Sequence, residues 1–248
     1  MSVVLHKEVP AQIAQMLQGS DWVCEVFFEN EDGTMLGCSR VVDPSLPWVY
    51  LSAGIHGDEP AGVLAVAAFL QNGVSDACNW LICPMLNPSG FARQQRGNAK
   101  GDDLNRDYLI LTSAEIRAHT SWVEKFPVPD LMLSLHEDWE AQGFYFYEIN
   151  LQEDRPDLSK QVLQAVAQVM PIEEARIIDD HEVRERGWIY HVPRADFPDS
   201  WPEAIYFAER GCPLSLTFET PSVALPLKQR IAAHQSAINA AFAWWHRQ

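Results

Sequence analysis

The feature that most constrains the fold is an apolar strand that ends in a polar turn and continues directly into a helix. Residues 48–51 are apolar and aromatic, which is typical of a buried strand, and residues 61–70 form an Ala-rich helical segment. His56 and Glu59 lie in the turn between them. Because open α/β sheets bind their ligands at the carboxyl ends of strands, this turn is a candidate site.

The spacing of His56 and Glu59 suits a shared metal ion. Gly57 between them permits a tight turn in which both side chains can reach one ion. Imidazole nitrogen and carboxylate oxygen are both good zinc ligands. The same spacing also arises by chance, and Glu59 beside Pro60 could instead complement the dipole of the helix that follows. The pair alone leaves both interpretations open.

The composition excludes several classes of partner. The chain has 248 residues, 47% of them hydrophobic, so one domain over residues 1–248 with a large core is the simplest account. The net charge of −16, from 18 basic and 34 acidic residues, argues against binding to nucleic acid or to anionic membranes. No apolar run is long enough to cross a bilayer, and the first residues lack a signal-peptide core. We therefore expect a cytoplasmic protein.

The cysteines are scattered, odd in number and free of any CxxC motif; they are Cys24, Cys38, Cys78, Cys83 and Cys212. We expect them to be small buried side chains with free thiols in a reducing compartment. The predicted metal site is therefore not built from thiolates.

The order of the predicted elements indicates an α/β fold. The sequence predicts helices over residues 9–17, 61–70, 112–126, 158–169, 202–209 and 225–245, and strands over residues 22–29, 34–42, 48–51, 79–85, 129–136, 144–149, 177–178, 188–190 and 214–218. Residues 30–33 form a strong hairpin turn between the first two strands. The strand–helix–strand order of residues 48–85 predicts a parallel pair with a right-handed crossover.

Polar residues follow the predicted strands at several places. Residues 87–108 form a long polar segment that contains Arg93, Arg96 and Arg106. A loop of this length in a compact domain is usually functional or disordered, and its position directly after a strand end favours function. Two further strands end on His136 and Glu219. If these strand ends share one edge of the sheet, the polar side chains converge there.

The converging residue types point to zinc-dependent hydrolysis. His56, His136 and Glu59 make a three-ligand zinc site with an open position, where zinc acidifies a water and polarises a carbonyl. Glu219 is a lone carboxylate at the end of an apolar strand, so burial should raise its pKa toward the range of a general base and acid. Arginine suits the binding of a substrate carboxylate and the stabilisation of an oxyanion.

Taken in order, these motifs resemble the zinc carboxypeptidase family. The motifs are His56-Gly57-Asp58-Glu59, Asn87-Pro88-Ser89-Gly90, Arg96, Gly101-Asp102-Asp103-Leu104-Asn105-Arg106, His136 and Phe218-Glu219. The resemblance covers residues 48–221 and looks closest to bacterial murein peptide amidase-like members. The related aspartoacylase and succinylglutamate desuccinylase branch usually carries an extra C-terminal domain, for which we expect no room in this chain.

The resemblance implies a fold and a metal site. The fold would be a three-layer α/β/α sandwich with a mixed, mostly parallel central sheet. One Zn²⁺ per chain would be bound by His56, Glu59 and His136. Asp103 would orient the ring of His56 from behind.

The resemblance also implies roles for four other residues. Glu219 would be the general base and then the acid, and Arg96 would polarise the scissile carbonyl and stabilise the oxyanion. Asn105 and Arg106 would bind a substrate carboxylate. Without the resemblance, Asn105 could equally be a loop residue that bonds its own backbone.

Two features depart from the family pattern. The mobile aromatic residue that usually covers the substrate cannot be assigned, and Tyr190, Phe197 and Tyr206 are all candidates. The acidic run at residues 137–140 could serve a basic substrate group or a second metal, although we favour a solvated loop.

The remaining histidines are better interpreted as surface or core residues than as ligands; they are His6, His119, His181, His191, His234 and His246.

We therefore expect a zinc metallocarboxypeptidase or amidase that cleaves an amide next to a free carboxylate in a short peptide. One alternative is an N-acyl amino acid deacylase, and another is an inactive metal-binding module. A serine esterase is disfavoured because no GxSxG motif occurs. The expected partner is a small peptide or N-acyl amino acid, with no nucleic acid or membrane, and the chain could form a homo-oligomer.

Overall fold

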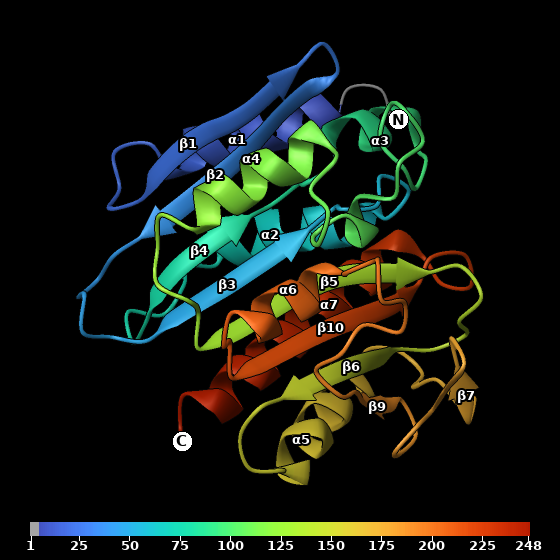
Figure 1. Ribbon diagram of the computed structural model, residues 1–248. Coiled ribbons are helices and arrows are strands. Elements are labelled where there is room, and N and C mark those ends of the chain that lie inside the picture. Colours follow the sequence, from blue (N-terminus) through green and yellow to red (C-terminus); the bar gives the residue numbers. More distant parts are fainter. Residues whose placement is uncertain (1–4) are drawn as a thin grey trace.

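An eight-stranded mixed sheet forms the centre of the structure, a computed structural model that describes the backbone of residues 5–248 and the side chains of residues 8–248 (Figure 1). The strand order is β1-β2-β4-β3-β5-β10-β6-β9. The pairs β4–β3, β3–β5, β5–β10 and β6–β9 are parallel, and the other three are antiparallel. The predicted mixed, mostly parallel sheet is therefore confirmed.

The strands and helices agree closely with the predicted segments. The strands are β1 (Val23–Asn30), β2 (Gly33–Arg40), β3 (Trp48–Ala53), β4 (Asn79–Cys83), β5 (Leu131–Asp138), β6 (Tyr145–Asn150), β7 (Ile177–Ile178), β8 (His181–Glu182), β9 (Trp188–Tyr190) and β10 (Leu214–Pro221). The helices are α1 (Leu5–Leu17), α2 (Pro60–Gln71), α3 (Pro88–Arg93), α4 (Ala114–Val123), α5 (Pro156–Val166), α6 (Glu203–Glu209) and α7 (Leu227–Trp245), with a 3-10 turn η1 (Leu104–Arg106). The short strands β7 and β8 form a separate antiparallel hairpin.

Helices cover both faces of the sheet, which makes three layers (Figure 1). Helices α1, α2, α5 and α7 pack together on one face, and α4 and α6 lie on the other. The central strands β3 and β4 are buried along their whole length, which explains why they are continuous apolar runs without polar alternation. The predicted three-layer α/β/α architecture is confirmed.

The closing helix α7 packs its apolar side against α2 and α5. Trp244 is buried and its indole N–H donates to Asp157 at 2.6 Å, while Trp245 packs against the core. Both tryptophans therefore contribute to the interior. Within residues 5–248 no helix combines the length and apolarity needed to cross a membrane.

The segment 87–108 contains more regular structure than the loop predicted for it. The side chain of Asn87 accepts a hydrogen bond from the backbone N–H of Gly90 at 2.8 Å and caps α3, with Pro88 in the first turn. Asp103 caps η1 in the same way through Asn105 N–H at 3.0 Å. These short helices arise from caps rather than from apolar periodicity, so the periodicity did not indicate them.

The expectation of five free thiols is wrong for two cysteines. Cys24 and Cys38 form a disulfide across the β1–β2 hairpin, where the register places them directly opposite each other with Cα atoms 4.1 Å apart. Such a pair depends on strand register, which composition does not reveal. Cys78, Cys83 and Cys212 are free and buried, as predicted.

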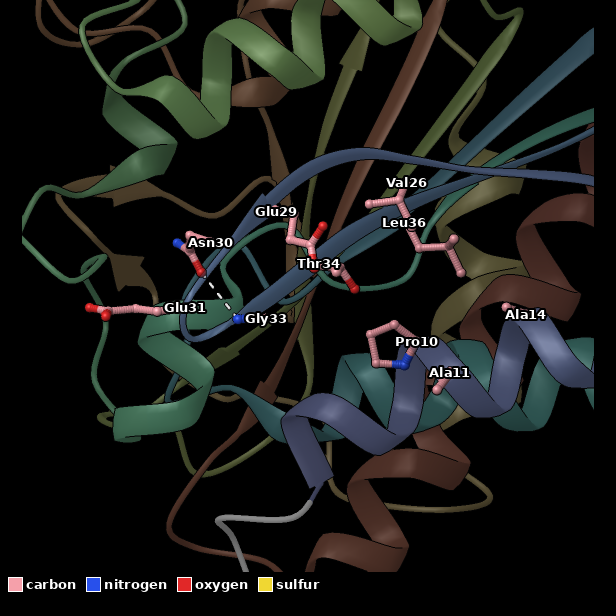
Figure 2. A pocket seen from close by; sticks show the side chains of 10 residues that line it. All are labelled: Pro10, Ala11, Ala14, Val26, Glu29, Asn30, Glu31, Gly33, Thr34 and Leu36. Carbon is pink, nitrogen blue, oxygen red and sulfur yellow. Dashed lines mark hydrogen bonds between the residues drawn. The ribbon is translucent and has the colours of Figure 1, made fainter.

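A hollow lies between α1 and the β1–β2 hairpin, at the edge of the sheet formed by β1 (Figure 2). Pro10, Ala11 and Ala14 line it from the helix, and Val26 and Leu36 line it from the hairpin. The predicted hairpin turn is present at its end, where Asn30 accepts a hydrogen bond from Gly33 N–H at 3.1 Å. The hollow shares no residue with the predicted metal site.

Candidate active site

The carboxyl ends of three parallel strands bring the predicted ligands together. His56 and Glu59 follow β3, His136 lies near the end of β5, and Glu219 lies near the end of β10. Strands β3 and β10 flank β5, and Glu219 is the direct register partner of His136. These strands run in the same direction and their ends lie at one edge of the sheet (Figure 1).

His56, Glu59 and His136 form a compact cluster, which we call the buried cluster. Each residue offers one ligand atom, these atoms all lie within 4.8 Å of one another, and the three residues are 3–4% exposed. His56 Nδ1 lies 2.6 Å from Glu59 Oε1 and 3.3 Å from His136 Nδ1. Two stretches far apart in the chain, the turn after β3 and the end of β5, therefore meet in this cluster.

The donor set of the buried cluster fits a metal ion. Glu59 Oε2 is buried without a hydrogen-bond partner, although His136 Nδ1 lies 3.1 Å away, because the angle there does not suit a hydrogen bond. Two imidazole nitrogens and a carboxylate that converge in a buried place need a cation between them. Glu59 starts α2 but its side chain makes no cap hydrogen bond, so the helix-dipole interpretation does not explain its orientation.

The charges around His56 favour a positive centre. Burial alone would lower the pKa of His56, but the carboxylates of Glu59 and Asp103 outweigh it and raise that pKa to about 9. Asp103 Oδ1 lies 3.3 Å from His56 Nε2, on the side of the ring away from Glu59. Asp103 therefore lies next to the imidazole ring of His56, the ring that the resemblance implied it would orient.

Three loops that surround the buried cluster are joined by one buried asparagine. Asn87 Nδ2 donates to the carbonyl of Ile55 at 3.1 Å and to that of Arg96 at 3.2 Å. A Cβ atom on Gly57 would lie 1.9 Å from the carbonyl carbon of Gly90. Gly57 is therefore required by the close approach of two loops rather than by the tight turn that we predicted.

Arg96 and Arg93, which only the family resemblance separated by role, occupy different surroundings. Arg96 Nε donates to Asp103 Oδ2 at 2.9 Å, and one terminal nitrogen lies 3.3 Å from His56 Nδ1. The Arg96 side chain is 48% exposed, so a substrate can reach it. Arg93 instead pairs with Asp32 at 2.7 Å on the outside of the molecule.

Asn105 and Arg106 are held differently from each other. The Asn105 oxygen accepts a hydrogen bond from the backbone N–H of Glu203 at 2.9 Å, which ties η1 to the start of α6 and leaves the amide NH₂ group as a donor. Arg106 is exposed, its guanidinium donates to the Asn105 carbonyl at 2.9 Å, and it pairs with no carboxylate of residues 8–248. The structure therefore leaves Arg106 free to bind an anion.

Glu219 is half-buried beside His136. The loss of water around its carboxyl group raises its pKa well above the usual value, and the negative charges of Glu59 and Asp138 raise it further, against the opposing effect of Arg96. The direction agrees with the expectation from the sequence. A carboxyl group with a raised pKa beside the buried cluster suits proton transfer.

The acidic run at residues 137–140 is not a uniformly solvated loop, because β5 continues through Asp138. Glu137 is buried, accepts a hydrogen bond from Ala61 N–H at 2.8 Å at the start of α2, and forms an ion pair with Arg230 of α7 at 2.8 Å. Only residues 139 and 140 are exposed. Arg230 could not be predicted as its partner, because the two residues lie 93 positions apart in the chain.

The three candidates for the mobile aromatic residue differ in exposure. Tyr206 is buried and its hydroxyl donates to Glu124 at 3.1 Å. Tyr190 lies under the Arg184 guanidinium at 4.8 Å in β9. Phe197 is 65% exposed, so it alone of the three has the freedom to move.

Comparisons with solved structures identify the fold. A provisionally assigned metallopeptidase from Shewanella amazonensis superposes with a TM-score of 0.81 over 96% of this chain and 91% of its own, at 24% identity. Carboxypeptidase A from Helicoverpa armigera superposes with a TM-score of 0.68 over 96% of this chain and 71% of the Helicoverpa chain, at 14% identity. The chain therefore has the zinc carboxypeptidase-like fold.

Comparisons of sequence place the chain more narrowly. Residues 45–167, about half of the chain, match the succinylglutamate desuccinylase/aspartoacylase catalytic domain. Carboxypeptidase 2 of Trichophyton rubrum is 27% identical over 151 residues, which are 52% of this chain and 28% of that protein. Carboxypeptidase E of Caenorhabditis elegans is 34% identical over 120 residues, which are 38% of this chain and 25% of that protein. The chain thus spans between a quarter and a third of the length of these relatives. The predicted resemblance is confirmed at this level: the chain has a zinc carboxypeptidase-like fold, and residues 45–167 are similar to the desuccinylase and aspartoacylase catalytic domain.

Proposed function

We propose that the chain is a zinc-dependent hydrolase that cleaves an amide bond next to a free carboxylate in a short peptide. The observation that carries this proposal is the buried cluster of His56, Glu59 and His136 beside the carboxyl group of Glu219. Two arginines accompany it: Arg96 lies against the cluster, and Arg106 is exposed with no carboxylate partner among the side chains of residues 8–248. Bound zinc would supply an acidified water and a polarised carbonyl.

Glu219 carries the proton in this proposal. Its raised pKa suits the removal of a proton from the attacking water and its delivery to the leaving amine. Arg96 stays charged, since its pKa is raised by Asp103 and Glu59 despite burial, and it stabilises the oxyanion. Asp103 contacts both Arg96 and His56 and so fixes their relative position.

Substrate binding is assigned to the η1 region. Arg106 binds the free carboxylate of the substrate through its exposed guanidinium, and the Asn105 amide donates to the same group. Phe197 covers the substrate from the segment before α6, because it is exposed and lies between β9 and that helix. Cell-wall-derived peptides are one source of such substrates.

A second candidate within the same class is an N-acyl amino acid deacylase. It is favoured by the match of residues 45–167 to the desuccinylase and aspartoacylase catalytic domain. Both candidates use the same ligands, proton carrier and carboxylate site. They differ in what lies on the acyl side of the scissile bond, a peptide or a small acyl group.

A paired assay separates these candidates. The zinc-restored protein is incubated with a library of short peptides that have free carboxyl termini and with a set of N-acyl amino acids, and release of the free amino acid is measured. Preference for peptides supports the carboxypeptidase, and preference for acyl amino acids supports the deacylase. Absence of turnover with both sets, when zinc is bound, would contradict the proposal and identify an inactive metal-binding module.

A further inference from the structure

A second group of two histidines and one carboxylate lies outside the candidate active site. His181 in β8, His191 just after β9 and Asp196 in the following segment offer ligand atoms within 4.8 Å of one another, and we call them the rim cluster. We propose that the rim cluster binds a second divalent transition-metal ion of the zinc type. This revises the interpretation of His181 and His191 as ordinary surface or core histidines.

The hydrogen bonding of His191 favours a metal ligand. His191 Nδ1 lies 2.6 Å from the backbone carbonyl oxygen of Val192, which can only accept, so this nitrogen carries the proton. In the neutral ring, Nε2 then presents a lone pair, and it faces Asp196 Oδ1 at 3.3 Å. Two acceptors in this arrangement repel unless a cation lies between them. A carbonyl behind the ring is also the usual means of orienting a metal-bound histidine.

The distances in the rim cluster suit a tetrahedral ion. His181 Nε2 lies 3.4 Å from Asp196 Oδ2, and the two imidazole rings approach edge to face with centroids 4.8 Å apart. Zinc bonds of about 2.0–2.1 Å place neighbouring ligands about 3.3 Å apart in a tetrahedron. The distances from His181 Nε2 and His191 Nε2 run to different oxygens of Asp196, and each is close to this spacing. Both are longer than an ordinary charge-assisted hydrogen bond of about 2.8 Å.

An aromatic residue supports both histidines. The Tyr147 ring packs edge to face against His181 and His191, with centroids 5.7 and 6.2 Å away. Its hydroxyl donates to Asp179 at 2.9 Å, which adds a negative group next to the cluster. Tyr147 is the register partner of Thr217, two residues before Glu219, so the rim cluster lies beside the active-site edge but shares no ligand with it.

The exposure of the rim cluster leaves room for an ion and for a further ligand. The side chains of His181, His191 and Asp196 are 23%, 11% and 55% exposed. An ion bound here would join the β7–β8 hairpin to the end of β9 and to the segment that carries Phe197. The inferred ion is therefore structural, and it orders the segment before α6.

The test is zinc stoichiometry of the full chain without an affinity tag. The protein is stripped with a chelator, titrated with zinc chloride in a calorimeter, and analysed for zinc after gel filtration. We expect two ions per chain for the wild-type protein. The double variant His181→Asn/His191→Asn should bind one, and the double variant His56→Asn/His136→Asn should also bind one. The exposed His246→Asn variant is the matched control and should bind two.

A single substitution at an exposed position provides a second test in case a double variant does not fold. Asp196→Asn changes an exposed side chain and should weaken the second binding step at least tenfold while the first step is unchanged. The inference is overturned if the wild-type protein binds one ion that only the His56→Asn/His136→Asn variant loses. It is also overturned if the His181→Asn/His191→Asn variant, folded by circular dichroism, still binds two.

Discussion

The buried cluster and the rim cluster contain the same kinds of ligand but are built in different ways. In the buried cluster the ligands come from the ends of β3 and β5, and each is 3–4% exposed. In the rim cluster the ligands come from a two-residue strand, the end of a three-residue strand and an irregular segment, and one ligand side chain is 55% exposed. The parallel sheet positions the first set before any ion binds, whereas the second set depends on the ion to order it.

The two clusters differ mainly in the contacts that hold their ligand-bearing segments in place. Glu137, next to His136, joins the start of α2 to Arg230 of α7, and Asn87 joins the loops around His56. Both residues are buried. The rim cluster is supported by the half-buried Tyr147 and by a backbone carbonyl. We therefore expect chemistry at the buried cluster and local ordering at the rim cluster.

The largest effect is expected from the proton carrier beside the buried cluster. Glu219→Gln should lower kcat by about 10³-fold or more, because general acid–base groups contribute about 10²–10⁴-fold and the same group acts twice. Zinc content should not change. The matched control is Glu140→Gln, which alters an exposed carboxylate near the end of β5 and should keep kcat. Retained turnover in Glu219→Gln would remove this residue from the mechanism.

The pH profile of the wild-type protein tests the role of Glu219. Because the pKa of Glu219 is raised, its carboxylate should be lost at a higher pH than an ordinary glutamate as the solution is acidified. The acid limb of kcat/KM should therefore lie clearly above pH 4.5 and should be measured between pH 4 and 9 at constant ionic strength. An acid limb at or below that value would contradict the assigned role.

The next effect concerns the ion pair that supports the buried cluster. Glu137→Ala leaves the Arg230 guanidinium buried without its partner, which should lower the free energy of unfolding by about 3–5 kcal/mol. Asp154→Ala breaks the exposed pair with Arg184 near the rim and should cost less than about 1 kcal/mol. Urea unfolding of both variants gives the comparison. Equal losses would show that the two regions are supported equally.

A smaller effect is expected on substrate binding. Arg106→Ala should raise KM for substrates with a free carboxylate by the equivalent of about 2–5 kcal/mol, because a charged hydrogen-bond partner is lost. KM for the corresponding amidated substrate should change little. If the unaltered protein cleaves amidated and free substrates equally well, Arg106 does not recognise the carboxylate.

The smallest expected effect is the contribution of each buried histidine to the pH dependence of the free energy of unfolding. Burial lowers the pKa of His119 and of His234 to about 3. In the unfolded chain the histidine pKa is about 6.5, so the unfolded chain binds more protons than the folded protein between the folded and unfolded pKa values. The stabilisation is therefore fully present above about pH 6.5 and is lost as the pH falls below it. Each histidine should cost about 1–2 kcal/mol between pH 7 and pH 5. His234→Asn should reduce the slope of unfolding free energy against pH, and an unchanged slope would contradict this assignment.

Much of the buried cluster could be predicted because its signal is local. An apolar strand followed by His56 and Glu59, and another that ends on His136, place polar side chains at strand ends whatever the rest of the chain does. The motif at residues 103–106 could be placed near them only through resemblance to a family. The structure shows the reason: η1 is fixed by the Asp103 cap and by a contact from Asn105 to Glu203, 98 residues away.

Apart from the capped short helices α3 and η1, the features that sequence reasoning missed depend on contacts between residues far apart in the chain or on strand register. Cys24 and Cys38 pair because the hairpin aligns them, and Glu137 is buried because α7 brings Arg230 to it. The rim cluster has no motif spacing, and only the close approach of β8 and the end of β9 shows that His181 and His191 can share an ion. Local patterns contain none of these distances.

The most direct test of the central claim is an anomalous difference map at the zinc absorption edge, from crystals of the tag-free protein grown with zinc. We predict a peak about 2.0–2.2 Å from His56 Nδ1, from a carboxylate oxygen of Glu59 and from His136. A map that shows zinc at other positions but none between these three side chains would contradict the account.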